Sequence, residues 1–492
     1  MLSSAPGAGG IIGEFDLQSS PASSRFARRR SARPGASSLA RRLIAWFAGL
    51  LLAVTAIVPA AVAQQAKQRS LQLIRDAEVE AYVRAMAAPI FKAAGLEDSA
   101  VRIILIEDST LNAFVAGGQN LFLNTGTLLA VATPEQLMGV IAHETGHIAG
   151  GHLVRSTDAL RNASIQQIIA TVLGAIAILS GGGEAGAAIM TGGSQVAVRS
   201  LLQYSRTQES TADQAAVTFL DKLHVTSRGL PEFLDIIQRD NLRIRGDQNP
   251  YVYTHPLTPE RIAALETRVS QSPYVDAAAA PIYVAMLARI QGKLHGYLDN
   301  PDTTLRRILP SSTNLADRYA RVVALYRKPD IPQFLTEIDA LLKSYPNDPY
   351  FLELKGQALL ENNRVADAVE PYRLAVKYAP KEPLIRVGLA SAMIATEDPK
   401  LADEAIRTLE VATNEDPDNA LAWYQLAIAY GRRNDIGMAS LASAERFLLV
   451  GKLEDAFTQA EKAEKLLPVG SPGALRAADI RELSLRLWRN RE

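Results

Sequence analysis

The chain has 492 residues, 48% of them hydrophobic, so it is long and apolar enough for several globular domains with cores of their own. Its 52 basic residues balance 52 acidic ones, which gives no support for nucleic acid as a partner. It contains no cysteine, which excludes disulfides, thiolate catalysis and cysteine-based zinc sites.

A secretory signal is the first element predicted along the chain. Two arginines precede an apolar run, residues 43–58, and an A-x-A cleavage motif ends at Ala63. The run is shorter than the about 20 residues that span a bilayer, so cleavage after Ala63 is favoured over a retained membrane anchor. Residues 1–63 are therefore interpreted as a disordered extension and a signal peptide, and we expect an exported protein.

The most specific chemical signal follows at residues 143–147, which read His-Glu-Thr-Gly-His. On a helix, residues four apart are rotated by about 40° from each other, so His143 and His147 can reach one metal ion. Glu144 lies beside them and can take a proton from metal-bound water, as in zinc hydrolases. Residues 136–142 are mostly apolar, which favours a buried helix over two solvated histidines.

A third metal ligand is needed, because catalytic zinc usually has three protein ligands and one open position. Glu209 is the best candidate, in a segment that predicts a second helix. Asp213 lies one turn further on the same face, where it can accept a ring N–H from His143 or His147. An exposed acidic helix face is the alternative that the spacing alone leaves open.

An apolar segment separates these two motifs. Residues 168–179 and 185–190 are apolar and are divided by glycines, which predicts a helical hairpin inserted at approximately 160–203. Each arm is too short to span a bilayer. A packed insertion, a lid over the cleft and a membrane-contacting surface all remain open, and we favour one of the last two.

The sequence after residue 275 contains regularly spaced prolines. Prolines recur at Pro346, Pro380 and Pro417, with steps of 34 and 37 residues, and Pro468 follows after 51 more. This period, with small and aromatic residues at fixed places, resembles tetratricopeptide repeats, although other helical hairpins remain an alternative. Such repeats form an α-solenoid with a concave groove suited to peptides or partner proteins.

The separated motifs together resemble the gluzincin metallopeptidases of the CAAX prenyl endopeptidase-like family, over approximately residues 70–270. HExxH is followed by ExxAD at residues 209–213 and by His255-Pro256 with Arg261. The resemblance implies one zinc ion per chain, bound by His143, His147 and Glu209, with Glu144 as the general base.

Upstream residues extend the resemblance to the substrate cleft. Asn112-Ala113-Phe114 and the strand-like residues 120–126 resemble the stretch that forms an edge strand along the cleft in this family. An edge strand can bind an extended peptide as an added strand, so the resemblance implies substrate contacts for Asn112 and Phe114. An ordinary sheet strand is the alternative.

His255 and Arg261 each have two possible roles. His255 can stabilise the oxyanion, or it can occupy the fourth metal position and keep the enzyme latent, as the resemblance to quality-control relatives suggests. Arg261 can pair with substrate or form a structural salt bridge. Extrapolation of the motif helix makes His152 face away from the metal, and His224 and His295 have no partners at ligand spacing.

These predictions combine into a mainly α (α+β) fold: a zincin-type metallopeptidase domain with a small sheet, residues 64–275, followed by a solenoid, residues 276–492. The resemblance implies a periplasmic zinc endopeptidase that degrades misfolded or stalled outer-membrane proteins. Its repeats would dock substrate or the outer-membrane assembly machinery, with peripheral membrane contact. The alternative is a repeat-based chaperone or scaffold with a regulatory metal site, against which the intact Glu144 argues.

Overall fold

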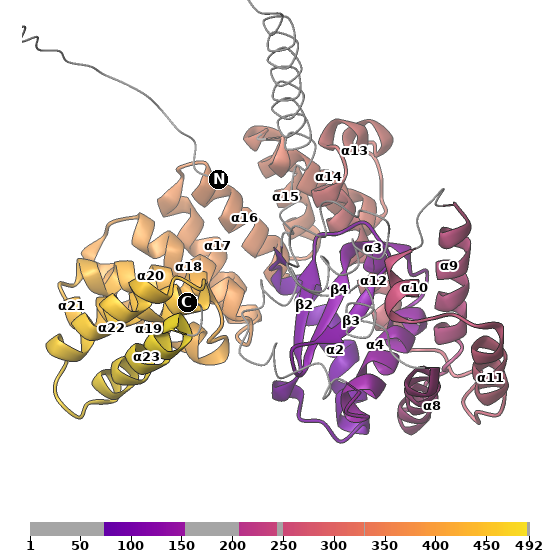
Figure 1. Cartoon of the computed structure of the whole chain (residues 1–492). Coiled ribbons are helices and arrows are strands. Elements are labelled where there is room, and N and C mark those ends of the chain that lie inside the picture. The colour runs from indigo at the N-terminus through magenta and orange to yellow at the C-terminus, as the bar shows by residue number, and fades with distance from the viewer. Residues whose placement is uncertain (1–72, 153–205, 244–248, 329, 490–492) are drawn as a thin grey trace, which may run out of the picture. The chain divides into compact units, whose positions relative to one another are not determined.

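The computed structural model describes residues 73–152, 206–243, 249–328 and 330–489 (Figure 1). The predicted signal peptide and the whole of the predicted hairpin insertion, residues 160–203, lie outside these ranges. Within the described residues, no helix combines the length and apolarity needed to cross a bilayer.

A small mixed sheet lies in the N-terminal part of the described chain, with the strand order β1-β2-β4-β3. Its strands are β1 (Leu73–Ile74), β2 (Arg102–Ile106), β3 (Ala113–Ala116) and β4 (Asn120–Asn124). β4 pairs in parallel with β2 and antiparallel with β3. A turn through Gly117 and Gly118, both at positive φ, folds β3 back on β4.

This topology corrects one expectation about the edge strand. Residues 112–114 and 120–126 together were expected to form it, but β4 is an inner strand with a partner on each side. β3, which contains Ala113 and Phe114, is one of the two edge strands, and β1 is the other. Sequence alternation does not reveal which neighbours a strand pairs with, and the parallel partner β2 is contributed by a separate stretch of chain.

Helices surround this sheet. They are α2 (Ala77–Ala93), the 3-10 turn η1 (Asp98–Ala100), α3 (Thr125–Ala130), α4 (Pro134–Ala149), α8 (Arg206–Lys222), α9 (Gly229–Arg243), α10 (Pro250–Thr254), α11 (Pro259–Ser270) and α12 (Pro281–Leu298). The motif helix α4 begins where the Thr133 side chain accepts from the Gln136 N–H and Pro134 occupies the first turn. Its residues are buried from Gln136 to His147, so it lies in the core beside the sheet.

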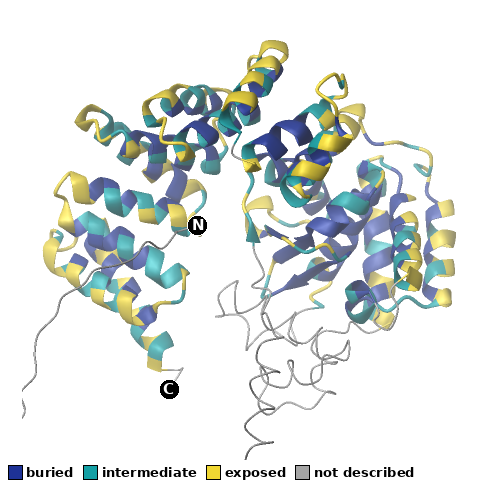
Figure 2. Cartoon of the chain, turned by 90° about the horizontal axis from the view of Figure 1, so that it is seen from above, coloured by how far each residue is buried: buried dark blue, intermediate teal, exposed yellow. Residues whose placement is uncertain are grey.

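One hydrophobic cluster joins the sheet to α2, α4, α8 and α9. Figure 2 shows this core in dark blue. α12, from the segment predicted to precede the repeats, contributes Leu287, Ile290 and Leu294 to the same cluster. The predicted limit at residue 275 stays a prediction.

The C-terminal half is built from consecutive helices. They are α13 (Pro301–Arg307), α14 (Leu315–Arg327), α15 (Ile331–Ser344), α16 (Pro349–Glu361), α17 (Val365–Tyr378), α18 (Pro383–Ala395), α19 (Pro399–Glu415), α20 (Ala420–Arg432), α21 (Ile436–Leu449), α22 (Leu453–Leu466) and α23 (Pro472–Arg489). Neighbours in the chain pack against each other, which confirms the predicted solenoid and, with the small sheet, the mainly α fold class.

The repeat signals in the sequence have a packing cause. A Cβ at Gly356 or Gly388 would lie 2.6 or 2.3 Å from the ring of Tyr372, so these small residues let α16 and α18 close around one aromatic side chain. The longer step from Pro417 to Pro468 also has an explanation. Pro468 lies between α22 and α23, within a helix pair, whereas Pro417 precedes the pair formed by α20 and α21.

Candidate metal centre

Helix α4 brings the two motif histidines together. His143 and His147 are completely buried, and their Nε2 atoms lie 3.1 Å apart. Glu144, on the same helix, is also completely buried. The helical spacing therefore produces the convergence of two imidazoles that the sequence predicted.

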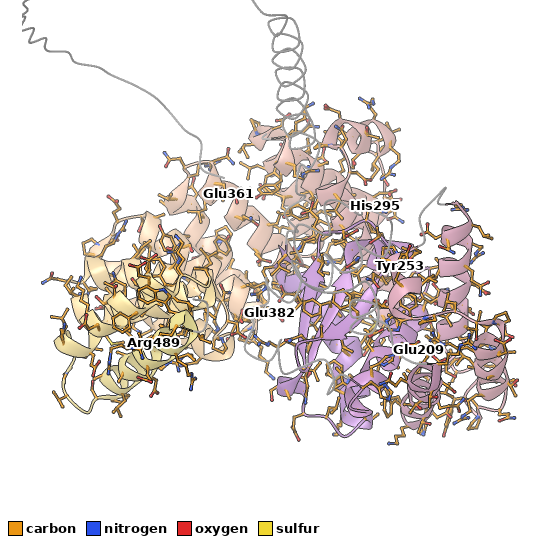
Figure 3. All side chains as sticks on the ribbon, in the orientation of Figure 1. Glu209, Tyr253, His295, Glu361, Glu382 and Arg489 are labelled. Carbon is orange, nitrogen blue, oxygen red and sulfur yellow. The ribbon has the colours of Figure 1, made fainter. Side chains whose placement is uncertain are left out.

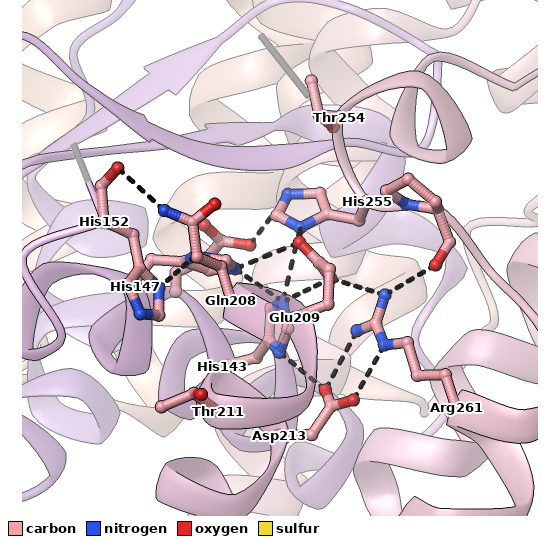
Figure 4. A network of polar contacts seen from close by, with 12 residues as sticks. His143, His147, His152, Gln208, Glu209, Thr211, Asp213, Thr254, His255 and Arg261 are labelled. Atoms are coloured by element: carbon pink, nitrogen blue, oxygen red, sulfur yellow. Dashed lines mark hydrogen bonds and ion pairs between the residues drawn. The ribbon is translucent and has the colours of Figure 1, made fainter. Parts of the chain in front are cut away.

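Helix α8 supplies a carboxylate to this pair. Glu209 is completely buried, with its oxygens 3.5 Å from His143 Nε2 and 3.3 Å from His147 Nε2. The close approach of α4 and α8 depends on Gly146, where a Cβ would lie 2.9 Å from the backbone of Ala212. Figure 3 places Glu209 among the helices of this part of the chain, and Figure 4 shows its contacts.

His255, just after α10, completes the group. Its Nδ1 lies 3.1 Å from Glu209 Oε1 and 3.3 Å from His143 Nε2, while its Nε2 lies 3.3 Å from Glu144 Oε1 and from the Ala113 carbonyl of β3. The structure thus brings His255 from a distant part of the sequence to both the motif helix and the edge strand.

The donor set fits a metal ion. One ligand atom from each of His143, His147, Glu209 and His255 lies within 4.8 Å of the others, and all four residues are buried. Glu144 adds a carboxylate that accepts no hydrogen bond from the described residues. Buried polar groups in such number are costly unless a cation or hydrogen-bond donors compensate them.

The pKa shifts follow from this crowding. Burial lowers the pKa of His147 to about 3, which keeps this ring neutral. Burial opposes the protonation of His143, but its hydrogen bonds with Asp213 and Glu209 raise its pKa to about 9. Burial also opposes the ionisation of Glu209, yet His255 and His143 hold the pKa of its carboxyl well below the usual range.

Arg261 and Asp213 form a buried bidentate salt bridge beside the cluster. The Arg261 Nε and Nη2 donate to the two oxygens of Asp213 at 2.7 and 2.9 Å, and its Nη1 lies 2.5 Å from Glu209 Oε2. Asp213 in turn contacts His143 Nδ1 at 2.9 Å. The structure thus pairs Arg261 with the carboxylates of the cluster, and Glu209 and Asp213 lie inside rather than on an exposed acidic face.

The predicted cleft residues lie on the edge strand and before it. Asn112 is completely buried, and its side-chain amide has no hydrogen-bond partner among the described residues. Its backbone N–H and carbonyl are both held by the Thr127 hydroxyl, at 2.8 and 2.9 Å. Phe114 stacks on Phe122 of β4 with ring centroids 4.8 Å apart, so it packs within the sheet.

Two residues near the cluster were not recognised from the sequence. Tyr251 is completely buried and stacks on His255, with ring centroids 4.5 Å apart. Tyr251 lies four residues before His255, and this helical spacing could have identified it from the sequence as a neighbour of that histidine. His152 was expected to face away from the metal, and it lies outside the ligand group, but its contact with a ligand was not foreseen: its Nδ1 lies 3.0 Å from His147 Nδ1. Helix α4 ends at Ala149, so helical angles do not extend to residue 152.

The other two histidines lie elsewhere. His224 has a positive φ and stacks on Tyr274, and His295 pairs with Asp299 one turn away. Both therefore have packing or surface roles.

The close approach at Gly146 leads to a stability prediction. Replacement by Ala is expected to destabilise the protein by about 1–3 kcal/mol, because α4 and α8 must move apart to accommodate the methyl group. Urea unfolding measures this loss. Gly431→Ala, at a helical site with no atom within 4 Å of the added Cβ, is the control and should not destabilise. Equal effects of the two changes would show that the helices do not need this contact.

An HExxH helix, a buried carboxylate from a second helix and a small sheet define this protein as a metallopeptidase. Residues 73–269 match the model of peptidase family M48, and residues 319–383 match that of the tetratricopeptide repeat. The chain therefore carries an M48 peptidase domain followed by tetratricopeptide repeats.

Curated relatives align with this chain over most of their length. The chain is similar to the beta-barrel assembly-enhancing proteases of Yersinia pestis, 25% identical over 406 residues, and of Escherichia coli (strain K12), 24% identical over 407 residues. Both alignments cover 82% of this chain and 82% of the relative. Among solved structures it is similar to yeast Tom70, with a TM-score of 0.30 and 16% identity over 60% of this chain and 64% of that one.

Proposed function

We propose that the protein is a zinc-dependent endopeptidase of the bacterial cell envelope. The observation that carries this proposal is the convergence of His143, His147 and Glu209 in one buried group, with Glu144 beside them. Two histidines and a glutamate are the ligands of many catalytic zinc sites. Zinc bound there would polarise the scissile carbonyl and make a water molecule nucleophilic near neutral pH.

Glu144 is the general base in this proposal. Burial raises the pKa of its carboxyl, which makes it a stronger base than an exposed glutamate. It can therefore take a proton from the attacking water and pass it to the amine that leaves. Asp213 accepts from His143 Nδ1 and so directs the Nε2 lone pair toward the cluster, which supports ligand geometry.

Substrate binding is proposed along β3. Among the described residues this strand lies at an edge of the sheet, it packs against α4, and its Ala113 carbonyl lies beside His255. An extended peptide added to such an edge would run past the cluster with little demand on its side chains. The Asn112 amide before β3 is completely buried and has no hydrogen-bond partner among the described residues, and it is proposed as a further contact for the peptide backbone.

His255 is proposed to restrain the enzyme by occupying the fourth metal position. Its Nδ1 already belongs to the ligand group, and its Nε2 contacts the proposed base Glu144. His255→Ala is therefore expected to raise kcat/KM on an unfolded protein about tenfold or more, because open minor states are typically populated at about 10% or less. Initial rates of cleavage measure the effect.

The control for this variant is His295→Ala. His295 lies on α12 and pairs with Asp299 outside the cluster, so its removal should leave cleavage unchanged. A simple loss of activity in His255→Ala would contradict the restraint and would assign the histidine to oxyanion stabilisation instead.

The substrates and partners of this peptidase are proposed from its relatives. Two of them are named for enhancing β-barrel assembly, and the alignments include the repeats as well as the peptidase domain. We infer that the protein acts in the periplasm on misfolded or stalled outer-membrane proteins and that its repeats bind substrate or the assembly machinery. Capture on the Glu144→Gln variant in the cell envelope tests this: trapped β-barrel precursors support it, and recovery of only periplasmic proteins contradicts it.

A further inference from the structure

His152 lies at the end of the motif helix, next to the metal ligands, and the mechanism above gives it no role. We propose that His152 is a positioning residue, which holds His147 in the orientation and tautomer that metal binding requires. This inference rests on the proposed zinc site but concerns metal affinity rather than peptide hydrolysis.

Two contacts of His147 point in opposite directions. Its Nε2 lies 3.3 Å from Glu209 Oε1, on the side of the ligand group, while its Nδ1 lies 3.0 Å from the Nδ1 of His152. The two imidazoles meet edge to face, with centroids 5.1 Å apart and planes at 74° (Figure 4). His152 therefore holds the nitrogen of His147 that faces away from the proposed metal.

The local backbone is shaped to place this ring. Gly151 has a φ of 61°, which reverses the chain after α4 and lets the His152 N–H donate to the carbonyl of His147 at 3.1 Å. Gly150 leaves the space, because a Cβ there would lie 2.5 Å from His152 Nε2. Gln208, the neighbour of Glu209, donates to the His152 carbonyl at 3.5 Å. Two glycines and a contact from α8 thus fix the position of His152.

The proton positions follow from the chemistry of a ligand. If Nε2 of His147 offers its lone pair to a metal, its proton is on Nδ1 and must be donated to an acceptor. The Nδ1 of a neutral His152 is that acceptor, with its own proton on Nε2. His143 uses the carboxylate of Asp213 for the same purpose. A neutral acceptor at His147 orients the ring without adding a further negative charge to a buried cluster that contains Glu144, Glu209 and Asp213.

His152→Phe tests this role, because phenylalanine keeps a ring of similar size and lacks the acceptor. Zinc affinity is measured by competition with a chromogenic chelator at fixed pH, and the dissociation constant is expected to rise about 10- to 100-fold. Circular dichroism and thermal melting of the metal-free protein establish that the fold is retained. His152→Gln, whose amide oxygen can accept a hydrogen bond, should recover part of the lost affinity, whereas a purely steric role predicts no recovery.

A second variant changes the position of the ring without changing its chemistry. Gly150→Ala should displace the His152 side chain and weaken zinc binding in the same direction. Unchanged zinc affinity in both His152→Phe and Gly150→Ala would overturn the inference. This failure differs from failure of the proposed function, since the latter would appear as absent zinc binding in the unmodified protein.

Discussion

Replacement of Glu144 by Gln is expected to abolish measurable peptide hydrolysis, lowering kcat by about 10²–10⁴-fold or more. Glutamine has the same shape and can occupy the same buried site, but it cannot accept a proton from the attacking water. The proposed ligands His143, His147 and Glu209 are untouched, so the variant should still bind one zinc ion per chain. Cleavage of an unfolded protein and the metal content of the same sample are the two measurements.

The control is Glu266→Gln, on an exposed face of α11, which should cleave at the unmodified rate. If Glu144→Gln with one bound zinc degrades unfolded protein as fast as the unmodified chain, the hydrolytic mechanism is wrong. The repeat-based chaperone or scaffold, with a regulatory metal, would then be the better interpretation. Retained binding of partners by an inactive Glu144→Gln variant is compatible with both functions and does not separate them.

The part of the site that could be predicted from the sequence is the part with helical spacing. His143 and His147 converge because they lie four residues apart on one helix, and Glu209 and Asp213 share a face of another for the same reason. Recurrent prolines, with small and aromatic residues at fixed places, likewise predicted the helices of the repeats. In each case the geometry is fixed within a few residues and needs no knowledge of the tertiary structure.

The errors and omissions concern contacts that local spacing does not fix. The contact of His152 with His147 was not predicted because the helical angle was continued past Ala149, where Gly151 at positive φ reverses the chain. The inner position of β4 depends on its pairing with β2, which is distant in the sequence. Arg261 had two open roles until the structure placed its guanidinium between two carboxylates of α8. Such pairings arise from tertiary packing, so neither periodicity nor composition reveals them.

A large loss of stability is expected when the guanidinium of Arg261 is removed. Arg261→Met should destabilise the metal-free protein by about 3–5 kcal/mol, because it leaves buried carboxylates without their counter-charge. The Asp213 side chain is 3% exposed and that of Glu209 is completely buried, so water cannot replace the lost hydrogen bonds. Urea unfolding in the presence of a chelator measures the change, and zinc affinity should fall as well because Asp213 and Glu209 lose their fixed positions.

Arg268→Met is the matched control, since it removes the same group from the same helix. Arg268 pairs with Asp221 at 3.4 Å, but the two side chains are 29% and 18% exposed, so solvent screens the pair and the loss should be about 0–1 kcal/mol. The difference between the two variants therefore measures what burial adds to an ion pair on α11. The contrary outcome is that Arg261→Met lowers the free energy of unfolding by no more than Arg268→Met does. In that case the salt bridge with Asp213 does not hold the ligands in place, and a role for Arg261 in binding substrate becomes the better explanation.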